Sequence, residues 1–166
     1  GSHTVNAGQT VTTTGTLLVG RAADGDLTIE SVGNVAANMT VGDVNGSAGS
    51  TLTLQNGATL TVNGAIDVAD ANNSGGTINL LGGSTLTKNG NSLDIGQAGN
   101  ATGTVNVIDG LLDLNGASGG RTLNIAGDGT GDSGTMGTVF VGANGQVDVN
   151  GGNTEVGRGG TGFLTV

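Results

Sequence analysis

Short segments in which apolar and polar residues alternate recur along the whole chain, and each segment ends in a turn that carries glycine. The clearest example lies between Gly76 and Gly103, where three such segments are led by Ile78, Leu86 and Leu93. Alternation with a period of two predicts strands that have one buried face and one exposed face. One unit of the chain therefore consists of three short strands and three corners.

This unit repeats from one end of the chain to the other. The first strands of successive units are led by aliphatic residues that lie 25, 26, 27, 34 and 25 residues apart, namely Leu27, Leu52, Ile78, Val105, Val139 and Leu164. The second strands follow nearly the same spacing and are led by Val35, Leu60, Leu86, Leu112 and Val147. A fixed period of this length is typical of solenoids, in which stacked repeats bury an apolar face that one repeat cannot bury alone.

The period predicts an all-β protein, a right-handed parallel β-helix (β-solenoid) with three short strands per coil and about six coils of roughly 26 residues. Such a coil is longer than the roughly 18 residues of a left-handed helix built from three hexapeptides. Parallel crossover connections are also right-handed in the large majority of proteins. We expect equivalent inward residues to stack, so that Leu54, Leu80, Val107 and Val141 form one internal column.

Glycine and asparagine mark the corners. The corners between first and second strands are predicted at Gly33, Gly57, Gly83, Gly110 and Gly145. The corners between second and third strands carry Asn-Gly pairs that begin at Asn63, Asn89, Asn115 and Asn150. Asn-Gly is also the commonest signal of a β-hairpin, but hairpins do not require recurrence near 26 residues. Because stacked strands lie about 4.8 Å apart, these four structural asparagines are predicted to form a ladder of side-chain hydrogen bonds.

Lys88 interrupts this regular pattern, because Val62 and Leu114 occupy the equivalent inward position in neighbouring units. We expect its aliphatic stem to lie along the corner and its ammonium group to reach solvent.

Composition narrows the classes of protein that fit. The 166 residues include 36 glycines and no Cys, Pro, Trp or Tyr, so the core has to be built from Leu, Ile and Val. A net charge of -9 disfavours binding to nucleic acid or to an anionic membrane, and no apolar run is long enough for membrane insertion. We interpret residues 1–3 as an expression-tag remnant and residues 4–166 as a single β-solenoid fragment of a longer repeat protein.

Carboxylates are the candidate chemical groups. With His3 as the one histidine, we predict no catalytic constellation and no cofactor. Asp67 and Asp94 are expected to be neighbours on the outward face of two third strands. Three interpretations of this pair stay open: a solvated polar face, a calcium site, or a catalytic pair. Asp128 and Asp132, in the long third corner, are further weak calcium candidates. If Asp67 and Asp94 ionise about 5 Å apart, at least one pKa should rise.

Three phrases recur in the units, G-T-x-x-V, x-L-x-V-N-G and L-x-I-G, as in GTVNV, TLTVNG and SLDIG. They resemble the glycine-rich repeats in the passenger regions of bacterial autotransporter adhesins and related outer-surface β-strand-repeat proteins. The likeness extends from Val5 to the end of the chain. It implies an extracellular, rod-like and non-catalytic stalk on the bacterial outer-membrane surface. Its expected partners are a host-cell or matrix surface, a glycan, or other copies of itself.

No functional residue is carried over from this family, because the shared residues are glycine, asparagine and aliphatic residues. Two alternatives remain, a purely structural stalk or phage-fibre segment and a polysaccharide-acting β-helix enzyme. The last segment, from Phe163 to Val166, has the pattern of a first strand without a second. Open parallel strand edges at the ends of the stack predict weak end-to-end oligomers.

Overall fold

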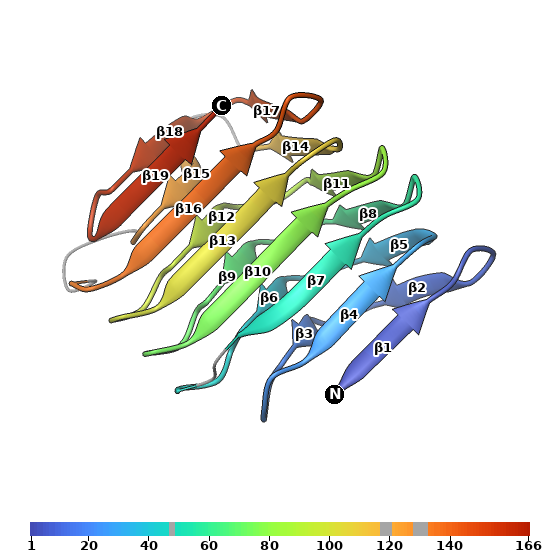
Figure 1. Ribbon diagram of the computed structural model, residues 1–166, viewed down its shortest axis with the longest axis horizontal. Helices are drawn as coiled ribbons and strands as arrows, with labels where there is room; N and C mark the ends of the chain where they lie inside the picture. The colour runs from blue at the N-terminus through green and yellow to red at the C-terminus, as the bar shows by residue number, and fades with distance from the viewer. Residues whose placement is uncertain (47–48, 117–120, 128–132) are drawn as a thin grey trace.

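The computed structural model describes residues 1–46, 49–116, 121–127 and 133–166. These residues form strands joined by turns and contain no helix that could cross a membrane. Figure 1 shows the strands stacked in order along the long axis, from the blue N-terminal end to the red C-terminal end.

Every third strand of the chain belongs to the same sheet, and all neighbouring strands are parallel. Sheet A contains β1 (Ser2–Val5), β4 (Asp26–Ile29), β7 (Ser50–Leu54), β10 (Gly75–Leu80), β13 (Thr102–Val107), β16 (Met136–Val141) and β19 (Thr161–Thr165). Sheet B contains β2 (Thr10–Thr13), β5 (Val32–Val35), β8 (Thr59–Val62), β11 (Thr85–Lys88), β14 (Leu111–Asn115) and β17 (Gln146–Asn150). Sheet C contains β3 (Leu17–Val19), β6 (Met39–Val41), β9 (Ile66–Val68), β12 (Leu93–Ile95), β15 (Arg121–Ile125) and β18 (Asn153–Val156).

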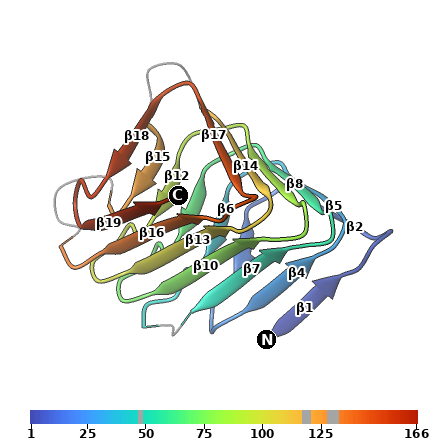
Figure 2. The same cartoon turned by 45° about the horizontal axis from the view of Figure 1, so that its top comes forward.

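The three sheets are the walls of a solenoid, as the tilted view in Figure 2 shows. Sheets B and C each have six strands and sheet A has seven, so six complete coils are followed by β19. This arrangement confirms the predicted all-β solenoid with three short strands per coil. The right-handed sense of the coil stays a prediction.

Inward side chains stack in register through the whole stack. Leu54, Leu80, Val107 and Val141 are successive register partners in sheet A and all are buried, which confirms the predicted column. Burying an aliphatic side chain of this size contributes roughly 1.5–3 kcal/mol, so a column extended through every coil is a major source of stability.

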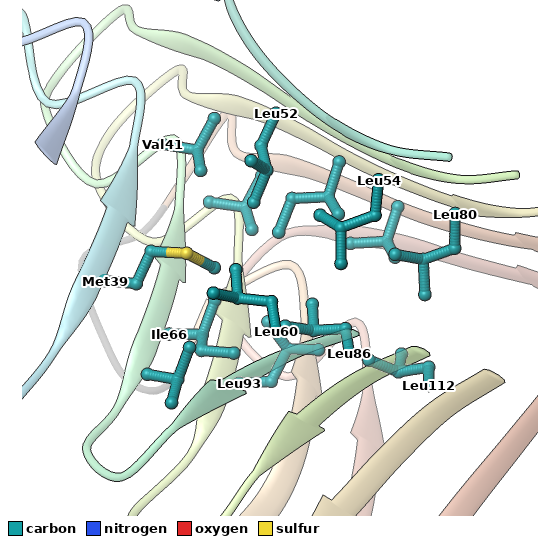
Figure 3. Packing of buried hydrophobic residues seen from close by; sticks show 14 of the residues in the cluster. Met39, Val41, Leu52, Leu54, Leu60, Ile66, Leu80, Leu86, Leu93 and Leu112 are labelled. Carbon is teal, nitrogen blue, oxygen red and sulfur yellow. The ribbon is translucent and has the colours of Figure 1, made fainter. Parts of the chain in front are cut away.

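Side chains from all three sheets meet in the interior, as Figure 3 shows for one part of the stack. Leu54 of sheet A, Leu60 of sheet B and Ile66 of sheet C belong to one continuous cluster of buried aliphatic residues. A single coil presents these side chains to water, and the coils above and below cover them.

The predicted asparagine ladder is present at the corner between sheets B and C. Asn89 Nδ2 donates to Asn63 Oδ1 over 3.2 Å, Asn115 donates to Asn89 over 3.2 Å, and Asn150 donates to Asn115 over 3.3 Å. Asn63 in turn donates to Asn34 over 3.3 Å, which extends the ladder by one coil beyond the prediction. Asparagine suits this position because its amide carries both a donor and an acceptor.

Gly33 does not turn a corner, contrary to the prediction. It lies inside β5 at an inward position, in register with Leu60, while Val35 lies opposite Val62. A β-carbon on Gly33 would lie 2.6 Å from Cδ1 of Leu60. The missing side chain therefore leaves the space that Leu60 fills. The prediction matched Val35 with Leu60, so the predicted register of this strand was wrong by two residues.

Each third strand is followed directly by a residue with left-handed backbone conformation. The φ values are +78° at Gly20, +83° at Gly42, +62° at Ala69, +69° at Gly96, +68° at Ala126 and +72° at Gly157. This conformation costs a residue with a β-carbon about 1–2 kcal/mol. The two alanines show that the stacked coils impose the same turn even where the local residue disfavours it.

This corner predicts different outcomes for two Gly→Ala substitutions. In Gly42→Ala the new β-carbon would lie 2.2 Å from the Gly75 carbonyl oxygen, whereas in Gly157→Ala the nearest atom is 3.4 Å away. We expect Gly42→Ala to lower the free energy of unfolding by about 3 kcal/mol or more, because a backbone clash is added to the left-handed strain. Gly157→Ala should lower it by about 1 kcal/mol. Urea denaturation measures both, and equal losses would contradict this account.

Candidate functional site

The outward positions of sheet C bring the candidate carboxylates together. Register places Thr40, Asp67, Asp94, Asn124 and Glu155 side by side on successive coils. This confirms that Asp67 and Asp94 are neighbours. The predicted rise in the pKa of one of them stays a prediction.

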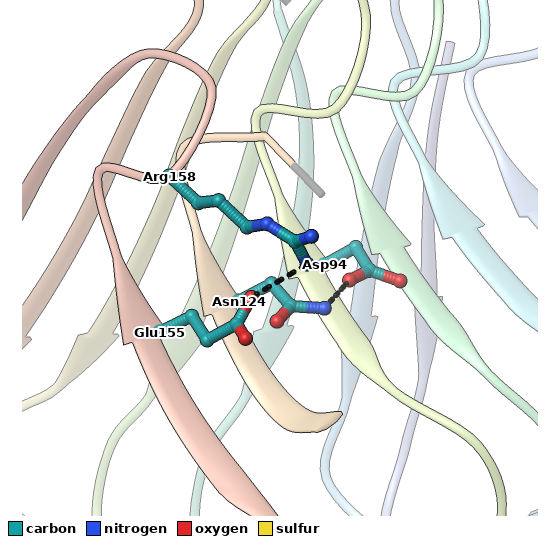
Figure 4. A network of polar contacts seen from close by, with 4 residues as sticks. All are labelled: Asp94, Asn124, Glu155 and Arg158. Atoms are coloured by element: carbon teal, nitrogen blue, oxygen red, sulfur yellow. Dashed lines mark hydrogen bonds and ion pairs between the residues drawn. The ribbon is translucent and has the colours of Figure 1, made fainter. Parts of the chain in front are cut away.

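Asp94 is buried, so the interpretation of this column as a solvated face was wrong at this position. The side chain of Asp94 is 5% exposed, and its carboxylate accepts hydrogen bonds from Ser92 Oγ and from Asn124 Nδ2 (Figure 4). Buried polar groups are stable only when they are hydrogen-bonded, and here the donors come from the same coil and from the next one.

Asn124 is held in one orientation by this contact. Its Nδ2 group faces the Asp94 carboxylate, and its Oδ1 atom is buried without a hydrogen-bond partner among the described residues. Exchanging the two ends of the amide would place oxygen against oxygen, so the orientation follows from electrostatics.

The same face ends in an ion pair near the C-terminal end. Arg158 Nη1 lies 3.2 Å from Glu155 Oε2, with the two side chains 45% and 28% exposed (Figure 4). Exposed pairs of this kind contribute little to stability.

Lys88 does not reach solvent, contrary to the prediction. Its side chain is fully buried at the inward position that Val62 and Leu114 occupy in neighbouring coils. The Nζ group donates to the carbonyl oxygen of Gly90 over 3.0 Å and also to that of Asn91. The lysine therefore turns its charged end toward the backbone of its own corner.

The corner beside the lysine is longer than that of the preceding coil. The corner from β11 to β12 covers residues 89–92, one residue more than the corner from β8 to β9 at residues 63–65. In this longer corner the carbonyl oxygens of Gly90 and Asn91 share one hydrogen-bond donor. Lys88 supplies that donor, which an aliphatic residue at the same position does not.

Burial lowers the pKa of the Lys88 ammonium group from its ordinary value of 10.5, and the nearby Asp94 carboxylate opposes part of this change. Desolvation disfavours the charged form of a base, and an adjacent negative charge favours it.

A second perturbed group lies at the third corner. The pKa of Asp70 is raised above its ordinary value of 3.8, first by burial and then by the negative charges of Asp43 and Asp94. Asp43 and Asp70 each follow the left-handed residue of their coil, so the stack brings their charges close together.

The calcium interpretation gains no support from the described residues, which contain no group of three or more His, Cys, Asp or Glu side chains that could hold a metal ion. Calcium takes six to eight oxygen ligands, whereas this pair offers two carboxylates, and that of Asp94 already accepts hydrogen bonds from Ser92 and Asn124. Asp128 and Asp132 lie outside the described residues.

Two hollows open at the ends of the stack, and sequence reasoning did not identify them as cavities. The hollow at the N-terminal end has a volume of about 300 Å³ and is lined by residues that include His3, Leu17, Val19 and Leu27. The hollow at the C-terminal end has a volume of about 360 Å³ and is lined by residues that include Val141, Val147, Val149, Leu164 and Val166. Both are the interior of the solenoid where no further coil covers it.

The chain matches no family model, no curated protein and no solved structure.

The buried lysine predicts a stability change at alkaline pH. A group whose pKa is lowered on folding binds fewer protons when folded, so the free energy of unfolding should rise as pH increases toward 10.5, the ordinary pKa of lysine. The chain has one lysine and no Tyr or Cys, which makes Lys88 the side chain to test in this range. Lys88→Met should lose this rise, and the uncharged control Leu114→Met should keep it. Parallel pH profiles for Lys88→Met and the unmodified chain would refute the assignment.

The raised pKa of Asp70 predicts the opposite dependence in acid. An acid whose pKa is raised on folding stabilises the fold below its unfolded pKa, and this contribution is lost as pH rises through the folded pKa. We expect Asp70→Asn to raise the melting temperature at pH 7 by roughly 2–4 °C, the shift typical of ~1 kcal/mol at this chain length. The gain should disappear near pH 3. Asp26→Asn, which removes an exposed charge, is the control, and an equal gain there would make the effect one of net charge.

Proposed function

We propose that this chain is a non-catalytic, rod-like segment of a secreted or cell-surface bacterial protein, and that it acts as an adhesive stalk through contacts with other copies or with a host surface. The observation that supports this most directly is that three parallel sheets continue through all six coils. Each coil repeats the contacts of the previous one, so length is gained by adding coils without a new core. The seven strands of sheet A span about 29 Å at roughly 4.8 Å per step.

The surface chemistry is suited to repeated weak contacts. The outward face of the stack carries threonine and asparagine in columns, such as Asn106 Nδ2 donating to Asn79 Oδ1 over 2.9 Å. Asn100 Nδ2 donates in the same way to Asn73 Oδ1 over 3.3 Å at another corner. Similar polar groups stacked over several coils, as Thr51, Thr77, Thr104 and Thr138 are in sheet A, repeat one hydrogen-bonding pattern, which favours binding to a partner that is itself repetitive.

The passenger regions of autotransporter adhesins are the proteins whose repeats these phrases resemble. That resemblance supports an extracellular location at the bacterial outer membrane and a role in adhesion or self-association. The composition agrees with an exported stalk, because the chain contains no cysteine and carries a net charge of -9.

The proposal can be tested by surface display. The chain is fused to an unrelated outer-membrane anchor in a non-adherent bacterial strain, and the same anchor carrying a globular domain of equal mass is the control. Cells that display the chain should settle from suspension, or bind epithelial monolayers or immobilised glycans, several-fold more than control cells. Equal settling and binding would reject the adhesive role, and release of reducing ends from polysaccharides would reject the non-catalytic role.

A further inference from the structure

Asparagine followed by glycine is a chemically reactive pair, and seven such pairs lie at or beside the corners of this solenoid. The backbone nitrogen of the residue after an asparagine can attack the Cγ atom of the asparagine side chain, and glycine places no side chain in the way. The attacking nitrogen first has to lose its proton, so the surroundings of its N–H group decide which pair reacts. The pairs begin at Asn45, Asn56, Asn63, Asn89, Asn115, Asn144 and Asn150.

Most of these glycine N–H groups are held in hydrogen bonds. Within the described part of the chain, the N–H groups of Gly90 and Gly151 donate no hydrogen bond. Gly151 belongs to the last coil, whereas the corner that contains Gly90 has a coil on both sides. The other five donate to backbone carbonyl oxygens over 2.8–3.2 Å, Gly46 to Asn72, Gly57 to Gly82, Gly64 to Ala37, Gly116 to Asn150 and Gly145 to Gly142.

The asparagine ladder makes the side-chain contacts of Asn63, Asn89 and Asn115 closely alike. Each side chain donates through Nδ2 to the asparagine one coil before it and accepts at Oδ1 from the asparagine one coil after it. A donor at Oδ1 stabilises the negative charge that forms on this oxygen when Cγ is attacked. The ladder therefore activates the three amides in the same way, and the glycine N–H group distinguishes them.

Lys88 adds a second difference at the corner of Asn89. Its Nζ group donates to the carbonyl oxygen of Gly90 over 3.0 Å, which places a positive charge beside the glycine whose nitrogen has to become an anion. An opposite charge within about 4–6 Å favours the ionised form of a group. The equivalent residues of the neighbouring coils, Val62 and Leu114, carry no charge.

We propose that Asn89 is a site of spontaneous deamidation, at which the backbone nitrogen of Gly90 displaces the side-chain amide group as ammonia. The Gly90 nitrogen gives its proton to water and forms a bond to Cγ of Asn89. The bond from Cγ to Nδ2 then breaks, and ammonia leaves after taking up a proton. The resulting succinimide ring adds water at either of its two carbonyl groups and opens to aspartate or isoaspartate. Asn89 is exposed, so water reaches the ring.

The product changes the ladder at this coil. A carboxylate at position 89 accepts from Asn115 as the amide did, but it has no N–H group to donate to Asn63. Its oxygen faces the Asn63 oxygen, so this hydrogen bond is lost and a negative charge is added to the corner. The isoaspartate form also adds a methylene group to the backbone of the corner. The amount of acid at this corner therefore increases with the age of the molecule, independently of the adhesive role proposed above.

The first experiment follows each asparagine while the purified, folded chain is incubated at mildly alkaline pH. Samples are digested with pepsin in acid, and mass spectrometry of the peptides measures the conversion of each amide to an acid. We expect Asn89 to react about fivefold faster than Asn63 and Asn115, the factor that the net contribution of one hydrogen bond gives in a rate. Equal rates at the three positions, or a faster reaction at Asn63 or Asn115, would overturn the proposal.

The same chain in concentrated urea is the matched control. Unfolding removes the ladder, the lysine contact and the glycine hydrogen bonds, but it leaves the three Asn-Gly pairs in the sequence. Their rates should then become similar. A preference for Asn89 that persists in urea would come from the local sequence, and it would reject the structural explanation.

The product identifies the route of the reaction. Isoaspartate forms through the succinimide, and methylation by an isoaspartyl methyltransferase detects it in the peptide that contains residue 89. Aspartate without isoaspartate would show direct hydrolysis of the amide and would reject attack by Gly90.

Lys88→Met tests the part played by the lysine charge. This variant should slow the reaction at Asn89, because the anion of the Gly90 nitrogen loses its neighbouring positive charge. The rates at Asn63 and Asn115 in the same sample should stay unchanged and serve as internal controls for the fold. A rate at Asn89 that is unchanged or raised would refute the role of the lysine charge.

Discussion

The parallel in-register ladder between coils is the interaction on which the rest of the structure depends. It places each residue over its equivalent in the next coil, about 4.8 Å away. Each side chain therefore has to make favourable contacts with a similar side chain above and below it. Aliphatic columns such as Leu54 over Leu80 do so by packing, and asparagine does so by donating to one neighbour and accepting from the other. A carboxylate has no such arrangement. The outward column of sheet C places Asp67 beside Asp94 but has uncharged residues on either side of the pair, Thr40 before it and Asn124 after it.

Repetition also explains how much of this structure could be predicted from the sequence. The strands, the inward columns and the asparagine ladder follow from a period that can be counted along the chain. The inward position of Gly33 and the burial of Lys88 could not be predicted, because each depends on contacts with residues outside its own strand. Gly33 leaves room for a leucine one coil away, and Lys88 donates to the backbone of a corner that is one residue longer than that of the preceding coil. The candidate pair was found by the same counting, but the burial of Asp94 depends on side chains that the pattern does not reveal.

Deviations from the average coil are concentrated at the corners. The strands keep one register over the central coils, whereas corners differ in length, in backbone strain at Ala69 and Ala126, and in the charges at Asp43 and Asp70. A strand residue is constrained by two neighbours in its column and by the core, while a corner residue faces water on one side. Corners are therefore where such a rod can acquire distinct chemistry without loss of its fold.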